Sequence, residues 1–242
     1  MAEKRALGVI PARGSSKRLP RKNLLPLNGR PLIAYMIGAA KASALDRVVV
    51  STEDEEIAAV AKREGGDVPF RRPAALSEDY AQDCDILLHA HDTVAAQEGR
   101  GYEILVHLQP TTPFVLPETI SACAETLRTT DANCCFAARV VSEPPQWMFR
   151  RGADAVVTSL LDKRLEGDAI HTQKLDRPFF PSGAAYAVRT EVLRREKTLY
   201  VAPLRIVEMD SLRAIDVDEE IDLMLAELAA KHWGFTVFEP SR

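Results

Sequence analysis

Five basic side chains crowd one loop near the N-terminus, in the stretch IPARGSSKRLPRKN at residues 10–23. Three small residues of the same loop, Gly14, Ser15 and Ser16, can turn backbone N–H groups toward one anion. Fixed cations and convergent N–H groups are the donors that bind phosphate oxygens. The loop therefore predicts a polyphosphate-binding site, with positive charge supplied by Arg13, Lys17, Arg18, Arg21 and Lys22.

Two common phosphate-binding motifs are absent from this loop. It has too few glycines for G-x-G-x-x-G, and it does not contain G-x-x-x-x-G-K-[ST]. The simpler alternative is a solvated basic loop. However, the loop directly follows an apolar run, and the loop after the first strand of an open α/β sheet is the usual phosphate binder. We therefore favour phosphate binding.

A pair of aspartates, Asp216 and Asp218, lies in the sequence IDVDEEIDL at residues 215–223. Two hard oxygen ligands beside a polyphosphate suit Mg²⁺, which bridges protein carboxylates to phosphate oxygens and keeps several waters. The alternative is helix capping and dipole complementation by the acidic residues Asp218, Glu219 and Glu220. We favour Mg²⁺ binding by Asp216 and Asp218, with Glu219 and Glu220 as ordinary first-turn acids.

The elements that must position these residues alternate between strands and helices. Short β-branched apolar runs at residues 6–12 and 47–51 are typical of strands buried on both faces, and further strands are expected at 104–108, 135–141 and 184–188. One helix is predicted to begin at Pro31, and a second helix is predicted to follow an N-cap at Thr52. Further helices are predicted over residues 78–98, 117–128 and 217–231. This alternation predicts an α/β fold with a doubly wound, mainly parallel sheet.

Residues 142–180 interrupt the alternation and show no clean period. A disordered loop is one interpretation. The segment also contains large apolar side chains that are costly to leave in water, which favours a subunit contact or a cover over the site: Trp147, Met148, Phe149, Phe179 and Phe180. We expect one domain over residues 1–242, with this segment as a dimerisation arm.

Composition restricts the class of protein further. The chain has 242 residues, 46% of them hydrophobic, and a net charge of −4, so the basic loop is a local feature and not a nucleic-acid-binding surface. It contains neither a run of membrane-spanning length nor a signal-peptide pattern, and its four cysteines lack C-x-x-C spacing. We expect a cytoplasmic protein with buried thiols, and neither a nucleic-acid nor a membrane partner.

The opening stretch, followed by LNGRPLIAY, resembles the signature I-P-A-R-x-x-S-K-x-x-P-x-K-N of the CMP-sialic acid synthetase (N-acylneuraminate cytidylyltransferase) family. The resemblance covers nearly the whole chain, through VVVSTEDEEIA at 48–58, RRPAALSED at 71–79, LQPTTPF at 108–114, PSGAAY at 181–186 and IDVDEEIDL. It implies a Rossmann-like nucleotidyltransferase that is dimeric and requires Mg²⁺. It also implies that CMP passes from CTP to a small sugar acid, with release of pyrophosphate.

The resemblance assigns roles to residues on the nucleotide side of the site. Arg13 and Lys22 match the family's phosphate-binding pair and are the expected catalytic residues, while Asp216 and Asp218 match its metal-binding aspartates. Arg72 falls on its base-side arginine, and Asp83 stands at a base-recognition position where a small hydroxyl residue is expected. The remaining nucleotide-binding positions implied by the resemblance are Ala12, Gly14, Ser15, Ser16 and Asn23.

On the acceptor side, the turn that contains Gln109, Thr111 and Thr112 matches the family's L-Q-P-T-S-P turn, which faces the sugar. Tyr186, Leu199 and Tyr200 fall where the family forms an apolar pocket for an N-acyl group. An aromatic and apolar trio is more often core than pocket, and that alternative stays open.

The arm departs from the family pattern. Thr172 stands where an arginine is expected, and Phe180 precedes Pro181 at a position that is basic in some members. The cation for an acceptor carboxylate could instead come from Arg150, Arg151, Lys174 or Arg177. A buried acceptor carboxylate without such a cation is costly. The missing cations therefore argue against N-acetylneuraminate as the acceptor and leave open a related nonulosonic acid such as legionaminate, a keto-deoxy sugar acid or a sugar 1-phosphate.

Two further functions stay open at this stage. Asp83 and the altered arm are compatible with a guanylyltransferase that uses GTP and a hexosamine 1-phosphate. A non-catalytic nucleotide-binding regulator of the same fold is the other alternative, although Lys22, Asp216 and Asp218 speak against it. His107 and His171 are weak candidates for a general base, because His107 lies in a strand pattern and His171 lies in the arm, which has no assigned structure.

Overall fold

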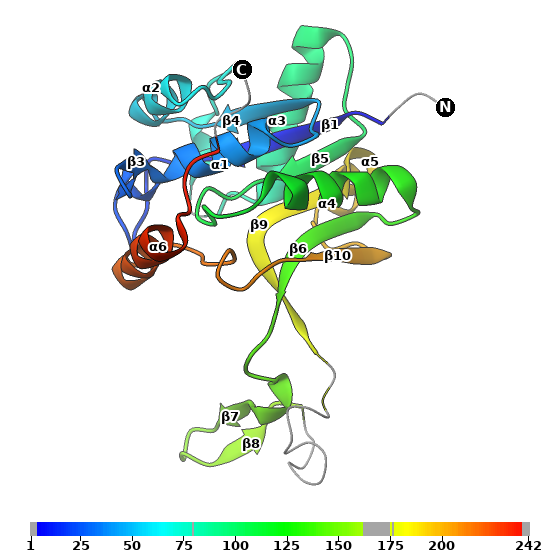
Figure 1. The fold of residues 1–242 in the computed structure, drawn as a ribbon. Coiled ribbons are helices and arrows are strands. Elements are labelled where there is room, and N and C mark those ends of the chain that lie inside the picture. The colour runs from blue at the N-terminus through cyan, green and yellow to red at the C-terminus, as the bar shows by residue number, and fades with distance from the viewer. Residues whose placement is uncertain (1–3, 79, 162–174, 176, 239–242) are drawn as a thin grey trace.

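The computed structural model describes residues 4–78, 80–161, 175 and 177–238. Their centre is a six-stranded sheet with the strand order β10-β6-β9-β5-β1-β4 (Figure 1). The strands are β1 (Ala6–Pro11), β4 (Arg47–Ser51), β5 (Ile104–His107), β6 (Cys134–Val140), β9 (Phe179–Arg189) and β10 (Leu204–Glu208).

The predicted mainly parallel sheet is confirmed, with one reversed strand among these six. Strand β1 pairs in parallel with β4 and β5, and β6 pairs in parallel with β10. Strand β9 is antiparallel to both of its neighbours, β5 and β6. Strand β9 therefore joins two parallel groups of strands into one mixed sheet.

Helices cover both faces of this sheet. Helices α1 (Leu32–Lys41), α2 (Glu55–Arg63) and α4 (Pro117–Thr129) pack on the face that carries Ala6 and Ile10. Helices α3 (Asp83–Glu98) and α5 (Thr190–Glu196) pack on the face that carries Leu7 and Val9. Because successive side chains of a strand point to opposite faces, a strand covered on both sides must be apolar throughout, as β1 is.

Helix α6 (Glu220–Trp233) belongs to a third apolar cluster beside the sheet, which includes Leu27 and Phe114. The shorter elements are the 3-10 turns η1 (Lys22–Leu24), η2 (Ala74–Ser77) and η3 (Pro145–Trp147), and the strand pair β2 (Pro26–Leu27) and β3 (Arg30–Pro31). All four cysteines are buried and free, as predicted. In the described part of the chain, no helix is long and apolar enough to cross a membrane.

The predicted start of α2 is wrong by two residues. The N-cap is Asp54, whose carboxylate accepts a hydrogen bond from the N–H of Ile57 at 2.9 Å. Thr52, the predicted cap, instead accepts a hydrogen bond from the N–H of Asp54 at 3.1 Å. The chain therefore makes one more turn after β4 before the helix begins, and the stronger capping residue takes the cap position.

Other boundaries also differ from the prediction. Pro31 is the N-cap of α1 and not its first residue, and α3 begins at Asp83, after η2, and not at residue 78. Helix α6 begins at Glu220 because Glu219 and Asp222 form a capping box that sets its start. Strand β10 and helix α5 were not predicted, and β9 is longer than the predicted strand at 184–188.

The paired ends of β6, at Val140, and β9, at Phe179, lead from the sheet toward the segment predicted as an arm (Figure 1). There, β7 (Phe149–Arg151) and β8 (Val157–Ser159) form an antiparallel hairpin that stands away from the sheet in Figure 1. Several large apolar side chains of the arm are exposed, among them Phe149 in β7, at 53%, and Phe180 in β9, at 57%. The predicted features at His171, Thr172 and Lys174 lie outside the described residues.

Candidate active site

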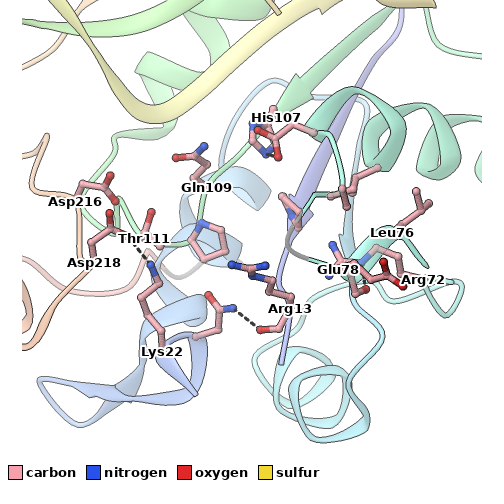
Figure 2. Close-up of a pocket in the computed structure, with 17 residues that line it drawn as sticks. Arg13, Lys22, Arg72, Leu76, Glu78, His107, Gln109, Thr111, Asp216 and Asp218 are labelled. Atoms are coloured by element: carbon pink, nitrogen blue, oxygen red, sulfur yellow. Dashed lines mark hydrogen bonds and ion pairs between the residues drawn. The ribbon is translucent and has the colours of Figure 1, made fainter. Parts of the chain in front are cut away.

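A cavity of about 380 Å³ opens at the carboxyl ends of β1 and β5 (Figure 2). After β1 the chain goes to β4 on one side of it, and later to β5 on the other side. The point where connections diverge from a central strand is where open α/β sheets bind ligands. The loop after β1 contributes Arg13, Lys22 and Asn23 to the cavity, and the segment before α6 contributes Asp216 and Asp218.

Lys22 lies at the cavity wall as predicted, and its ammonium group contacts an aspartate. Its Nζ lies 2.8 Å from Oδ1 of Asp218, and Arg18 pairs with Oδ2 of the same carboxylate at 2.6 Å. Burial alone would raise the pKa of Asp218, but the hydrogen bond and charge of Lys22, together with Arg18, lower it. Asp218 is therefore an anion held between two cations at the edge of the cavity.

Asp216 has a different environment on the same wall. Asp216 is an exposed residue, and its carboxylate accepts a hydrogen bond from the Thr111 hydroxyl. Desolvation raises the pKa of Asp216, and the hydrogen bond from Thr111 only partly opposes this. The helix-capping alternative is correct for Glu219, which is the N-cap of α6 and not a first-turn acid, whereas Glu220 lies in the first turn as predicted. Asp218 does not cap the helix, and its backbone N–H donates to the Asp222 carboxylate. The carboxylates of Asp216 and Asp218 both face the cavity.

Asn23 connects the two ends of the basic loop. Its Nδ2 donates to the backbone oxygen of Arg13 at 3.3 Å, and both residues line the cavity. The Oδ1 atom of Asn23 is buried and has no hydrogen-bond partner within the described residues. An acceptor buried at a cavity wall is expected to meet a donor from a bound molecule or from water.

The small residues of the loop do not line the cavity, although the sequence places them beside the phosphates. The N–H of Gly14 donates to Oε1 of Glu53 at 2.7 Å, so this amide is engaged within the protein. A Cβ atom on Gly14 would lie 2.4 Å from Oδ2 of Asp54, so a glycine is required for the loop to pass this side chain. Ala12 is buried and donates its N–H to Ser51, and neither Ser15 nor Ser16 lines the cavity.

Arg72 lies on the opposite wall, where the base was predicted, and is held by a buried network. Its guanidinium group lies 2.6 Å from Oε2 of Glu53, and its Nε donates to the Ser77 hydroxyl at 2.9 Å. Burial alone would raise the pKa of Glu53, but hydrogen bonds from Gly14, Arg72 and Ser77 outweigh it and lower the pKa. Glu53 therefore links the basic loop to the base wall, a role that sequence analysis missed.

Two further residues at the cavity lie close together, Asp83 at the start of α3 and His107 at the end of β5. The Nε2 atom of His107 lies 3.8 Å from Oδ1 of Asp83. Burial lowers the pKa of His107, and the charge of Asp83 only partly opposes this. The sequence signal for His107 is its position at the carboxyl end of a strand, where open α/β sheets bind ligands.

On the acceptor side, the structure brings Gln109 and Thr111 to the cavity. Thr112 is buried behind them and donates to the backbone oxygen of Ser182 at 3.1 Å. Gly183, which sequence analysis did not single out, has a φ of +82°, and a Cβ atom there would lie 2.8 Å from Oε1 of Gln109. The glycine of the PSGAAY motif thus makes room for Gln109.

The predicted apolar trio does not line the cavity. Tyr186 is buried, and its ring contacts those of His107, at 6.1 Å, and Tyr200, at 6.0 Å. Leu199 packs against the apolar cluster under α3, and Tyr200 is half exposed. Tyr186 therefore lies beside His107, as its pairing partner on the neighbouring strand β9, and Leu199 fits the core alternative.

Comparison with known proteins agrees with this geometry. The cytidylyltransferase family matches residues 7–221 of the chain. The chain is 33% identical over 229 residues to a CMP-N,N′-diacetyllegionaminic acid synthase of Legionella pneumophila, an alignment that covers 92% of this chain and 95% of that protein. It is 29% identical over 226 residues to a pseudaminic acid cytidylyltransferase of Campylobacter jejuni, with 93% and 96% covered.

A solved structure of a CMP:2-keto-3-deoxy-manno-octonic acid synthetase, in complex with CTP, has the same fold. It matches with a TM-score of 0.67 and 20% sequence identity, over 94% of this chain and 99% of that one. The family match spans the basic loop, the base wall, the Gln109 turn and both aspartates. Because this match covers most of the chain and includes the residues of the site, the chain belongs to the cytidylyltransferase family.

Proposed function

We propose that this enzyme transfers the CMP group of CTP to a nonulosonic, sialic-acid-like sugar acid and releases pyrophosphate. The observation that carries the proposal is the convergence of Arg13, Lys22, Asp216 and Asp218 on one cavity, with Gln109 and Thr111 beside them. The names of the two relatives, a legionaminic acid synthase and a pseudaminic acid cytidylyltransferase, support an acceptor of this class.

In the proposed reaction a hydroxyl oxygen of the acceptor attacks the α-phosphorus of CTP in line. The new O–P bond forms as the bond from the α-phosphorus to the bridging oxygen breaks, pyrophosphate leaves with that oxygen, and the hydroxyl proton passes to water. Negative charge grows on the leaving group, and fixed cations stabilise such charge when they are already in position. Lys22 and Arg13 lie where they would do this, and Lys22 is also poised against Asp218.

We propose Mg²⁺ as the cofactor, held by Asp216 and Asp218. Among the residues that the structure describes, no cluster of three or more His, Cys, Asp or Glu side chains could hold a metal ion. The protein would supply two carboxylates and CTP would supply phosphate oxygens, which is the coordination that suits Mg²⁺. The donor set therefore fits the ion, which when bound would neutralise phosphate charge.

We also propose a homodimer in which the arm forms part of the contact between subunits. The exposed apolar side chains of the hairpin, such as Trp147, Met148 and Phe149, support this, since a folded chain rarely leaves such a patch in water. Arg150, Arg151 and Arg177 lie exposed in the same region and are candidates to meet the acceptor carboxylate.

The test is pyrophosphate release with each of the four nucleoside triphosphates and a panel of acceptors: N-acetylneuraminate, legionaminate, pseudaminate, keto-deoxyoctulosonate and glucosamine 1-phosphate. We expect release with CTP and a sugar acid, complete loss with EDTA and recovery with added Mg²⁺. Release with GTP and the sugar phosphate, or full activity in EDTA, would contradict the proposal. Tight CTP binding without turnover on any acceptor would favour the regulator.

A further inference from the structure

His107 is a buried polar side chain at the cavity that lacks partners in the protein. Its residue is 1% exposed, and both ring nitrogens are without a hydrogen-bond partner within the described part of the chain. A buried imidazole that makes no hydrogen bond is unfavourable, because its hydrogen bonds to water are lost on folding and are not replaced. Since His107 lines the cavity, a bound molecule can supply the missing partner.

The side chain beside His107 is an acceptor. Oδ1 of Asp83 lies 3.8 Å from Nε2 of His107, which is too long for a direct hydrogen bond. An ion pair is also disfavoured, because burial lowers the pKa of His107. A neutral imidazole offers one acceptor nitrogen. When that nitrogen is Nε2, the two acceptor atoms are spaced to bracket a single atom that donates to both, at about 2.9 Å from each.

Such a donor must carry two hydrogens, as an amino group does. The pair also lies at the base end of the cavity. Asp83 follows the wall formed by Arg72, Ser77 and Ala81, and Figure 2 shows His107 across the cavity from Lys22, which marks the phosphate end. Of the parts of CTP, the one that carries an exocyclic amino group is the base, at its C4 position.

We propose that Asp83 and His107 together accept the two hydrogens of the 4-amino group of cytosine, and that this pair distinguishes CTP from UTP. Uracil carries a carbonyl oxygen at the same position, which would face two acceptors and receive no hydrogen bond. A site built to pair with a polar group rejects an analogue that cannot make the bond, because its own buried groups then stay unpaired. This inference rests on the proposed function, since it assumes that a cytidine nucleotide occupies the cavity.

The experiment measures binding by calorimetry, with Mg²⁺ and without acceptor, so it does not depend on knowing the sugar. The probes are CTP, UTP and the triphosphate of pyrimidin-2-one riboside, which carries hydrogen at C4. We expect wild-type enzyme to bind CTP about 100-fold more tightly than UTP, and His107→Phe to reduce this ratio about 10-fold or more. Asp83→Asn should improve UTP binding, because its amide can donate to the carbonyl oxygen.

A matched control is His91→Phe, the same substitution on helix α3 but outside the cavity, which should leave the CTP to UTP ratio unchanged. The inference is overturned if His107→Phe keeps the wild-type ratio, or if the pyrimidin-2-one nucleotide binds as tightly as CTP. If His107→Phe fails to fold, Asp83→Asn still decides the matter, because Asp83 is half exposed. Failure of wild-type enzyme to bind any of the pyrimidine nucleotides would instead contradict the proposed function itself.

Discussion

Lys22 is the residue whose charge the proposed reaction needs most. Its side chain is 15% exposed and already paired with Asp218, so its ammonium group is fixed before substrate arrives. A preorganised charge costs little to reorient when charge develops on the leaving group. The sequence singled out Lys22 among the five cations of this loop because it matches a phosphate-binding position of the family motif, whereas charge and position after the first strand are common to all five.

Replacing Lys22 tests this role directly. We expect Lys22→Ala to lower kcat/KM for pyrophosphate release by about 100- to 1,000-fold, because one positioned donor to the developing charge is lost. Lys22→Arg should recover part of the activity. The control is Lys17→Ala, a change of the same kind in the same loop, at a residue that does not line the cavity. Equal activity in Lys22→Ala and Lys17→Ala would contradict the assignment.

We expect Glu53 to stabilise the folded protein as well as to hold Arg72 in position. Its partner Arg72 has a side chain only 2% exposed, so removal of the carboxylate leaves a buried cation without its partner. We expect Glu53→Ala to lower the free energy of unfolding by about 2–3 kcal/mol, somewhat less than for a fully buried pair. Glu55→Ala is the control. Glu55 pairs with Arg71 on the surface, and its loss should cost less than about 1 kcal/mol in urea denaturation.

The lowered pKa of Glu53 also predicts a pH dependence. The folded-state pKa lies below the ordinary value of 4.5, so the folded protein binds fewer protons than the unfolded chain near that pH. The stability contribution is therefore fully present above pH 4.5 and is lost as pH falls through the folded-state pKa. Thermal unfolding from pH 7 to pH 3 should show a smaller decline for Glu53→Ala than for wild type. Parallel curves would contradict this.

At the scale of elements, the acceptor wall depends on the backbone of β9. Gly183 has a left-handed φ of +82°, and it lies where the β6–β9 pairing shifts register, opposite the interval between Phe136 and Ala138. A side chain there would meet Oε1 of Gln109 at 2.8 Å and Oγ1 of Thr112 at 3.0 Å. The absence of a Cβ atom therefore keeps the Gln109 turn in place.

We expect Gly183→Ala to raise the KM for the acceptor several-fold while leaving CTP binding nearly unchanged, because Gln109 must move and the base wall need not. The matched control is Gly99→Ala, since Gly99 has a φ of +70° but no atom within 4 Å of its would-be Cβ. Gly99→Ala therefore introduces a similar backbone strain to Gly183→Ala, but its Cβ atom contacts no neighbouring atom. Steady-state kinetics with both substrates varied would separate the two effects, and a matching rise in KM for Gly99→Ala would contradict the prediction.

The elements that could be predicted from the sequence are those with a strong hydrophobic pattern. Strands β1 and β4 are continuous apolar runs because helices cover both faces, and such runs are visible without a structure. Strand β10 is an edge strand whose Leu204 and Ile206 are partly exposed, so its pattern is weaker. The approach of Asp83 to His107 depends on how α3 packs across β5, which no local pattern specifies.

At the scale of the whole molecule, the arm hairpin and the sheet serve different purposes. The sheet and its helices build the cavity, whereas the hairpin leaves large apolar side chains in solvent. Apolar side chains exposed to solvent are unfavourable in a single subunit, which supports the proposed contact with a second subunit. The sequence indicated the segment as an arm because it breaks the helical and strand periods while staying rich in aromatic residues.

We expect the wild-type protein to have the mass of a dimer in light scattering. Phe149→Glu should shift it toward monomer, because a charge would be placed in the apolar contact. Thr129→Glu, at the exposed end of α4, is the control and should not change the mass. A wild-type monomer, or a Phe149→Glu variant that remains fully dimeric, would contradict the role of the hairpin in assembly.

Strand β9 is one continuous element of 11 residues that runs from Phe179 in the arm to Arg189 in the sheet. Between these ends it passes Gly183, where its pairing with β6 is interrupted and where it touches the Gln109 turn. Strands are stiff along their length, and an interrupted pairing is where they bend most readily. The point where β9 bends most readily therefore lies beside the Gln109 turn, so a shift of the arm would change the position of this turn, which is the proposed contact with the acceptor.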